Sequence, residues 1–264
     1  MKFNPIHSTD IAVSQLGLGT VKFGRNQQVK YPSQFDLPSD DEIMTLLEIA
    51  QGLGINFIDT APAYGISEER LGKLLGSRRD DWVIMSKAGE DFHDSQSHFD
   101  FSPCAINESV ERTLLRLRTN RVECLLLHSS GEDLEILDHS GAVETLFNLK
   151  EQGLVRSIGI STKTVEGGLR AIELGLDAVM VTYNPWHLAK EAVLDAAEKS
   201  GTSVFLKKTF GSGWLGDENA SADPVAEALG FVFSHPATTS AVVGTINPKH
   251  LRENCETLER VHPN

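Results

Sequence analysis

The stretch "NFIDTAPAYG", residues 56–65, decides the fold of this chain. It begins with the apolar residues of a buried strand and ends in a turn marked by proline and glycine. An acid, Asp59, closes the strand, and a phenol, Tyr64, follows five residues later. An acid and a phenol on the two sides of one strand-to-helix loop indicate a functional loop, whose nature depends on the rest of the chain.

Composition places the chain among globular proteins. Its 264 residues are 40% hydrophobic and 23% charged, and this length suits one large α/β barrel or two smaller domains. No apolar run approaches the roughly 20 residues that a membrane-spanning helix needs. The start, "MKFNPIHSTD", lacks the apolar segment of a secretion signal. We therefore expect a cytoplasmic protein without a membrane segment.

Charge and cysteine usage exclude several classes of function. A formal net charge of −13 disfavours nucleic-acid binding, which requires a basic stripe. Three cysteines that lie far apart, without a CxxC pair, predict neither a disulfide framework nor a zinc site, so we expect no metal. The HExxH, GxSxG and complete GxGxxG patterns are absent, which argues against a metalloprotease, an α/β-hydrolase and a Rossmann site. The expected partners are small molecules, and the sequence makes no prediction of the oligomeric state.

Eight short apolar segments predict strands. Most of them lack the polar alternation of a half-exposed strand, which favours a parallel sheet buried on both faces. The predicted strands cover residues 16–21, 55–60, 82–87, 122–128, 155–161, 178–183, 203–208 and 240–245.

Segments with helical periodicity separate these strands. They cover residues 39–54, 67–76, 102–119, 133–153, 164–175, 187–201, 223–235 and 248–261. Strand and helix thus alternate eight times, which is the order of an α/β fold of the (β/α)8 TIM barrel type. An open doubly wound sheet is the alternative, but eight pairs in about 250 residues match the usual barrel size. We expect one domain over residues 1–264, with a hairpin in residues 2–15 closing the barrel floor.

Polar residues gather at the carboxyl ends of the predicted strands, where barrel enzymes build their active sites. Buried charges are costly unless they are paired, so a group of charged side chains at one barrel mouth requires a functional explanation. The residues concerned are Asp59 and Tyr64 after the second strand, Lys87 after the third, His128 after the fourth, Ser161 and Thr162 after the fifth, and Lys207 and Lys208 after the seventh.

The segment "FIDTAPAYGISEERLGKLLG" resembles the signature of the aldo-keto reductase superfamily. The segments "MSK", "LLLHS", "GIST" and "PKHLREN" extend the resemblance over nearly the whole chain. The resemblance implies NAD(P)H-dependent reduction of aldehydes or ketones, with a small-molecule carbonyl compound as the substrate. It also implies four catalytic residues, which are Tyr64, Asp59, Lys87 and His128.

The chemistry of carbonyl reduction explains these residue types. Hydride transfer to a carbonyl carbon leaves an alkoxide that must be protonated, and a tyrosine with a pKa near 10 is a reluctant donor. A lysine beside the phenol would favour the phenolate, and a carboxylate would compensate the buried lysine. We therefore interpret Tyr64 as the proton donor, Lys87 as its electrostatic partner and Asp59 as the partner of Lys87. His128 would donate a hydrogen bond that orients the carbonyl oxygen.

The resemblance further implies a nicotinamide cofactor across the barrel mouth. NADP(H) is expected over NAD(H), although Ile246 and His250 stand where relatives often carry the basic residue that binds the 2′-phosphate. Lys249 or Arg252 could replace that residue. Thr162 stands where the family carries an asparagine. The predicted cofactor-binding residues are Gly19, Thr20, Asp59, Ser161, Thr162, Lys207, Lys208, Gly211, Ser212, Gly244, Thr245, Asn247, Glu253 and Asn254.

Substrate specificity is expected from an open site, because the chain ends soon after its last predicted helix, at "RVHPN". The segments that would set it are residues 88–101 and 129–140, with Trp186 and Trp214 near the mouth. Two other classes of function stay open. One is a nicotinamide-binding sensor module with little turnover, and the other is a barrel lyase or aldolase that uses Lys87 or Lys207 as a Schiff-base amine.

Overall fold

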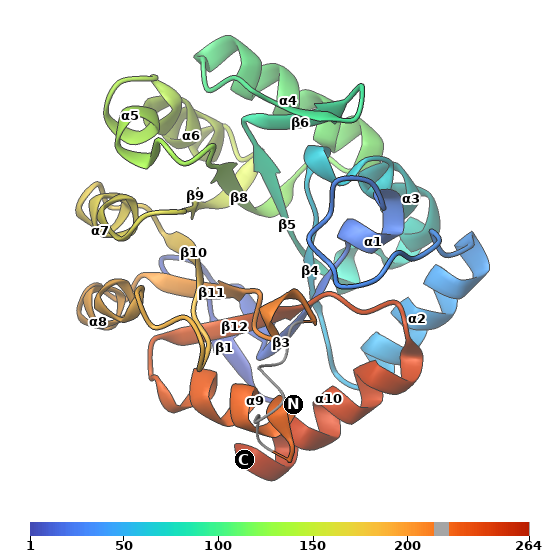
Figure 1. The fold of residues 1–264 in the computed structure, drawn as a ribbon. Helices are drawn as coiled ribbons and strands as arrows, with labels where there is room; N and C mark the ends of the chain where they lie inside the picture. Colours follow the sequence, from blue (N-terminus) through green and yellow to red (C-terminus); the bar gives the residue numbers. More distant parts are fainter. Residues whose placement is uncertain (214–221, 264) are drawn as a thin grey trace.

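Eight parallel strands close into a barrel in the computed structural model, which describes residues 1–213 and 222–263 (Figure 1). The predicted (β/α)8 TIM barrel is confirmed, and the observed strand ends lie within two residues of the predicted ones. β12 pairs with β3 and closes the barrel. The barrel strands are β3 (Leu16–Gly19), β4 (Phe57–Asp59), β5 (Val83–Ala88), β8 (Val122–His128), β9 (Val155–Ser161), β10 (Ala178–Thr182), β11 (Ser203–Lys207) and β12 (Thr238–Val243).

Helices surround the barrel, as Figure 1 shows. The expected helix over residues 133–153 is in fact two helices, because Gly141 precedes the second one with a φ of 80°, a conformation that glycine adopts without strain. The helices are α2 (Asp40–Gly52), α3 (Ser67–Leu75), α4 (Pro103–Leu117), α5 (Asp133–Asp138), α6 (Ala142–Glu151), α7 (Val165–Glu173), α8 (Glu191–Ser200), α9 (Pro224–Ser234) and α10 (Pro248–Val261).

Local sequence signals account for the starts of these helices. Ser39 and Glu42 form a reciprocal capping box at α2, which satisfies two backbone N–H groups. Proline occupies the first position of α4, α9 and α10, where no backbone N–H is needed. Asn247 caps α10 by accepting a hydrogen bond from the backbone N–H of Lys249 at 2.9 Å.

The apolar core has two layers. One lies between the barrel and its helices, and the other fills the barrel interior with side chains such as Phe57, Met85 and Phe205. An N-terminal hairpin, β1 (Phe3–Pro5) and β2 (Ala12–Ser14), adds Ile6 and Val13 to the interior layer. The predicted hairpin in residues 2–15 is therefore confirmed.

A second hairpin follows β5 and was predicted only as a loop. It consists of β6 (Glu90–His93) and β7 (Gln96–Phe99), which pair in antiparallel fashion. Gly89 leads into it with a φ of 95°, and a Cβ there would lie 2.3 Å from the ring of Phe101. Glycine is thus required where the chain turns from the barrel into the hairpin.

Four short helical segments complete the described structure: α1 (Val21–Gly24) and three 3-10 turns, η1 (Pro62–Tyr64), η2 (Gly76–Asp81) and η3 (Gly211–Gly213). In residues 1–213 and 222–263, no helix combines the length and the apolar character that crossing a membrane requires.

Candidate active site

The loop after β4 carries both Asp59 and Tyr64. β4 ends at Asp59, and η1 then places Tyr64 one turn above the strand end. Gly65 follows with a φ of 63°, and a Cβ there would lie 2.2 Å from the carbonyl oxygen of Gly24. Glycine therefore lets the loop turn closely against α1, so that the phenol stays above the barrel.

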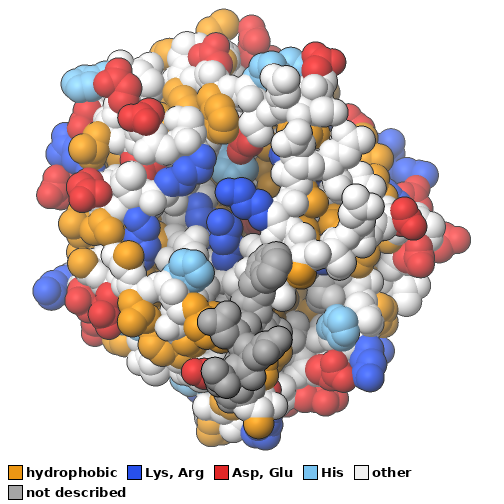
Figure 2. Space-filling view, viewed as in Figure 1, with side chains coloured by type: hydrophobic (Ala, Val, Ile, Leu, Met, Phe, Trp, Pro, Cys, Tyr) orange, Lys and Arg blue, Asp and Glu red, His pale blue; other side chains and the backbone are white. Residues whose placement is uncertain are grey.

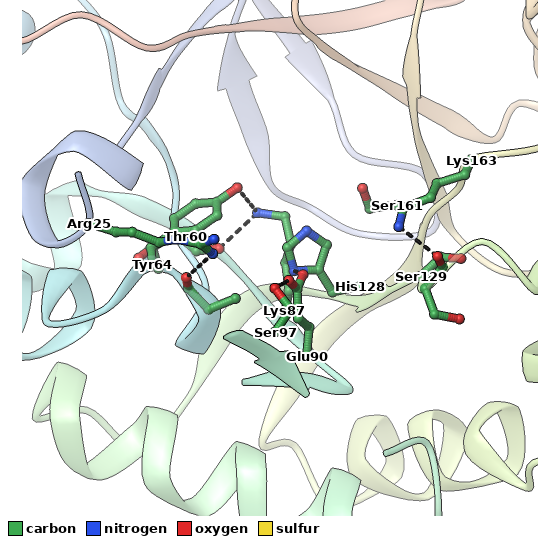
Figure 3. A network of polar contacts seen from close by, with 12 residues as sticks. Arg25, Thr60, Tyr64, Lys87, Glu90, Ser97, His128, Ser129, Ser161 and Lys163 are labelled. Atoms are coloured by element: carbon green, nitrogen blue, oxygen red, sulfur yellow. Dashed lines mark hydrogen bonds and ion pairs between the residues drawn. The ribbon is translucent and has the colours of Figure 1, made fainter. Parts of the chain in front are cut away.

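Lys87 contacts both of these side chains at the mouth of the barrel, and Figure 3 shows its contact with Tyr64. Its Nζ forms an ion pair with Oδ1 of Asp59 and donates to the carbonyl oxygen of Thr60 at 2.9 Å. The same Nζ lies 3.0 Å from the phenol oxygen of Tyr64, which in turn donates to Oδ2 of Asp59 at 3.3 Å. The Lys87 side chain is only 1% exposed, so the carboxylate compensates a fully desolvated ammonium.

The phenol of Tyr64 is protonated in this environment. Burial, followed by the negative charge of Asp59, raises its pKa well above the ordinary value near 10. The sequence led us to expect that Lys87 would lower this pKa. The pKa of Tyr64 is raised instead, because burial penalises the phenolate and the negatively charged Asp59 accepts the phenol hydrogen.

His128 lies at the end of β8 and meets a residue that the sequence analysis missed. Its Nδ1 is buried 2.8 Å from Oε2 of Glu90, although the angle falls short of a regular hydrogen bond. Burial lowers the pKa of His128, while Glu90 acts in the opposite direction. Burial alone would raise the pKa of Glu90, but the nearby His128 and the hydroxyl of Ser97 lower it to about 2. Glu90 is therefore a carboxylate at every physiological pH.

Asp59, Tyr64 and His128 line a cavity of about 1190 Å³ that extends across the mouth to the loop after β12. Lys87 is not among the lining residues but contacts Asp59 and Tyr64. The barrel register brings the walls of the cavity together, since Gly19 pairs with Asp59 and Thr182 pairs with Lys207. Most of the predicted cofactor-binding residues line this cavity. They are Gly19, Thr20, Asp59, Thr162, Lys207, Lys208, Ser212, Gly244, Thr245, Glu253 and Asn254.

Three predicted cofactor-binding residues do not line the cavity. Ser161 lies beneath it, where its hydroxyl accepts a hydrogen bond from Nζ of Lys207 at 2.7 Å. Gly211 lies in η3 beside the lining residue Ser212. The side chain of Asn247 caps α10 instead. These placements make Ser161 a support for Lys207 and Asn247 a support for the helix.

Neither of the two tryptophans expected near the mouth is found in the described cavity wall. Trp186 follows β10 but is not among the residues that line the cavity. Trp214 lies outside the described residues. The described cavity wall instead contains residues that the sequence analysis did not select. They include Lys22, Arg25, Lys30, Tyr31, Lys163, Thr182 and Lys190.

Lys207 is held in the floor of the cavity. Its Nζ donates to the hydroxyl of Ser161 and, at 3.0 Å, to the carbonyl oxygen of Thr162. Burial, followed by the nearby charges of Lys208 and Lys87, lowers the pKa of Lys207 to about 7. This end of the cavity thus brings several lysine side chains close together.

Comparison with known proteins agrees with this geometry. The sequence model of the Aldo/keto reductase family matches residues 15–228. The chain belongs to this family. D-threo-aldose 1-dehydrogenase of a Pseudomonas species is 31% identical over 81% of this chain and 70% of its own length. Pyridoxine 4-dehydrogenase of Escherichia coli is 27% identical over 95% of this chain and 91% of its own length.

A solved structure of a Pseudomonas aeruginosa protein assigned to the aldo-keto reductases is similar over almost the whole chain. It is 46% identical, covers 98% of this chain and 94% of its own chain, and has a TM-score of 0.89. The predicted resemblance to aldo-keto reductases is thus confirmed, and the family and its named relatives make this protein an oxidoreductase.

The cavity of this aldo-keto reductase fits a nicotinamide dinucleotide. Gly244 and Tyr31 both line the cavity, and a Cβ on Gly244 would lie 3.1 Å from the phenol oxygen of Tyr31. Glycine at this position therefore keeps the cavity wide between these two residues. The N-terminus of α10 and the lysines after β11 supply the positive field that a pyrophosphate requires.

Potential metal ligands in residues 1–213 and 222–263 approach one another at a place away from this cavity. The three potential ligands that approach one another there are Asp195, Glu198 and His235, which do not line the cavity.

Proposed function

We propose that this protein reduces aldehydes or ketones to alcohols with a nicotinamide dinucleotide as the reductant. The observation that carries the proposal is the position of the Lys87 ammonium, which contacts both Asp59 and Tyr64, two residues that line the cavity. The bound cofactor would supply the hydride. The chain's own residues would bind the carbonyl compound, orient its oxygen and supply the proton.

Tyr64 is the proton donor in this proposal. Its phenol holds the proton at neutral pH, and an alkoxide is a much stronger base than a phenolate, so the O–H bond breaks as the alcohol O–H bond forms. The negative charge that remains on the phenol oxygen develops 3.0 Å from Nζ of Lys87. Lys87 therefore acts when the charge appears, and Asp59 keeps Lys87 in place.

His128 would orient the carbonyl oxygen through its second ring nitrogen. Because Nδ1 is buried against Glu90, Nε2 is the nitrogen available to the cavity. When the ring is doubly protonated, a hydrogen bond from Nε2 and one from the phenol of Tyr64 would bind the same oxygen from two sides. This arrangement polarises the carbonyl group that receives the hydride.

The remaining cavity residues would bind the cofactor. Gly19, Thr20 and Thr162 border the part of the cavity next to the catalytic residues, with Lys207 in its floor. Lys208 and Ser212 would bind the pyrophosphate. Gly244, Thr245, Glu253 and Asn254 would bind the adenosine, with Gly211 and Asn247 shaping their loops.

NADP(H) is the proposed cofactor. His250 lines the cavity, whereas Lys249 is 79% exposed and lies 3.7 Å from Glu253. Lys22 and Lys30 add positive charge to the cavity wall, which favours a cofactor with an additional phosphate. We also propose a cytoplasmic location and small-molecule substrates without nucleic acid.

A Schiff-base mechanism receives less support from the contacts of the two candidate lysines. Nζ of Lys87 contacts Asp59, Thr60 and Tyr64, and Nζ of Lys207 donates to the hydroxyl of Ser161. Both amines are therefore engaged by the protein itself.

Titration with NADPH and, separately, with NADH tests the cofactor half of the proposal. Quenching of tryptophan fluorescence should report micromolar binding, with tighter binding of NADPH. Lys208→Gln should weaken binding several-fold, because a charge at the proposed pyrophosphate site is lost. The control, Lys199→Gln, removes an exposed lysine of α8 and should bind as the wild type does. Failure of both cofactors to bind would contradict the proposed function.

A further inference from the structure

The cavity wall carries more positive charge than the proposed cofactor accounts for. Lysine and arginine side chains gather in and beside the hollow at the centre of the face in Figure 2, although the chain has a net charge of −13. Among the described residues, none of these cations has a carboxylate partner within ion-pair distance. The cations of the lining are Lys22, Arg25, Lys30, Lys163, Lys190, Lys207 and Lys208.

Some of these cations lie toward the proposed phosphate end. Nζ of Lys22 lies 4.1 Å above the ring of Tyr31, whose hydroxyl adjoins Gly244. The charge of Lys30 acts on Lys208, which places these two lysines near each other. Lys22, Lys30 and Lys208 are therefore suited to the phosphates of the cofactor.

Arg25 is committed to structural contacts. Its guanidinium stacks on the ring of Phe92 in β6 at 3.4 Å and donates to the carbonyl oxygens of Gln27, Ala63 and Gln28. Its charge also faces Glu90. Arg25 thus supports the loop of Tyr64 and has little capacity left for a ligand.

Lys163 and Lys190 have donors to spare beside the loop that follows His128. Nζ of Lys163 donates to the carbonyl oxygen of Ser130, two residues beyond His128, at 2.7 Å. Nζ of Lys190 donates to the carbonyl oxygen of Lys163 at 2.9 Å. A lysine ammonium has three donor hydrogens, so each of the two keeps further hydrogens for a ligand.

The position of Lys163 is built by its neighbours. The carboxylate of Asp133, which is 1% exposed, accepts hydrogen bonds from the backbone N–H groups of Lys163 and Thr164 at 2.9 and 2.7 Å. On its other side, Nζ of Lys163 lies 5.5 Å above the ring of Phe99 in β7. Figure 3 shows Lys163 across His128 from Arg25 and Tyr64, on the side of Ser129.

We propose that the carbonyl substrate carries an anionic group, a carboxylate or a phosphate, which Lys163 and Lys190 bind. This inference rests on the proposed reductase function. The carbonyl oxygen would lie between Tyr64 and His128, and the anionic group would lie toward the loops that follow β8 and β9. A short aldehyde with a terminal carboxylate or phosphate meets both requirements, because the two ends reach different sides of one cavity.

Matched substrate pairs test the inference. Succinic semialdehyde is compared with butanal, and glyceraldehyde 3-phosphate with glyceraldehyde, each at saturating cofactor. We expect kcat/KM to be at least tenfold higher for the anionic member of one pair, mainly through KM. The pair that shows the preference identifies the anionic group.

The variant Lys163→Gln/Lys190→Gln should lower this ratio of kcat/KM values at least tenfold, and Lys199→Gln should retain the wild-type ratio. Calorimetric titration with succinate and with inorganic phosphate provides a second readout, in which the double variant should bind the preferred anion at least tenfold more weakly.

Two results would overturn the inference in distinguishable ways. Equal kcat/KM values for anionic and neutral aldehydes would reject the anionic substrate and leave the reductase function intact. Absence of reduction of all four aldehydes would reject the proposed function itself, and with it the inference.

Discussion

At Tyr64, burial and two opposite charges act on one phenol. Burial and Asp59 favour the protonated form, while Lys87 lies where the phenolate charge would develop. This arrangement separates two requirements that conflict in water, because the donor must keep its proton at neutral pH and yet release it to the substrate. Removal of Asp59 would leave the Lys87 charge buried and unpaired, so these residues act as a unit.

The contact between His128 and Glu90 predicts which form of the imidazole is active. Because Nδ1 faces a carboxylate, it holds the ring proton, and Nε2 can then donate only when the ring is doubly protonated. The value of kcat/KM should therefore fall as the pH rises through the pKa of His128, which burial places below its ordinary value near 6.5.

Glu90→Gln removes the carboxylate that raises the pKa of His128. The falling limb of the pH profile should consequently move to lower pH, and kcat/KM at neutral pH should decrease. Asp91→Asn is the matched control, since Asp91 is the next residue of β6 and pairs with Arg112 instead. An unchanged profile in Glu90→Gln, or an equal shift in Asp91→Asn, would argue against the role of Glu90.

At the scale of elements, α5 connects two loops of the mouth. Its first residue, Asp133, accepts a hydrogen bond from Ser129 after β8 and bonds from Lys163 and Thr164 after β9. Through these hydrogen bonds, the helix fixes the loop after β8 and the loop after β9 relative to each other, and these are the loops that would contact the substrate. A buried carboxylate suits this task because it accepts several hydrogen bonds at once.

Asp133→Ala should lower the free energy of unfolding by about 2–4 kcal/mol, because it leaves several buried donors without an acceptor. Urea denaturation followed by tryptophan fluorescence measures this change. Glu135→Ala, an exposed acid of the same helix, should change stability by less than about 0.5 kcal/mol. Equal stability of Asp133→Ala and wild type would show that the loops are held by other contacts.

The hairpin β6–β7 is the element that the sequence analysis did not foresee. Its residues are mostly polar and mostly exposed, so the apolar alternation that identifies a strand is weak. What fixes it is tertiary contact, through Glu90 to His128 and Phe92 to Arg25. The same limit explains why Glu90, Arg25 and Lys163 were not selected as site residues, since loop paths depend on neighbours distant in sequence.

At the scale of the whole molecule, the closed barrel brings the carboxyl ends of all eight strands to one mouth, where the candidate site lies. Periodicity identified all eight strands. The rule that barrel sites lie at carboxyl ends selected Asp59 and His128, which line one cavity, and Lys87, which forms an ion pair with Asp59. The sign of the net pKa shift of Tyr64 was not predictable in this way, because burial in the closed barrel outweighs the pairwise effect of Lys87.

The distribution of charge also belongs to the whole molecule. A chain with a net charge of −13 lines its mouth with lysines and an arginine, so the field of the surface and the field of the cavity differ in sign. Such a cavity attracts small anions, while the surface disfavours large polyanions. This separation is consistent with a dinucleotide cofactor and small anionic substrates.

The most direct test of the account is steady-state reduction of succinic semialdehyde and butanal by Tyr64→Phe, combined with cofactor titration of the same variant. We predict that kcat/KM falls about 10²–10⁴-fold for whichever aldehyde the wild type reduces, while the cofactor affinity stays within a few-fold of wild type. Near wild-type turnover in Tyr64→Phe would contradict the assignment of Tyr64 as the proton donor, on which the proposed mechanism depends.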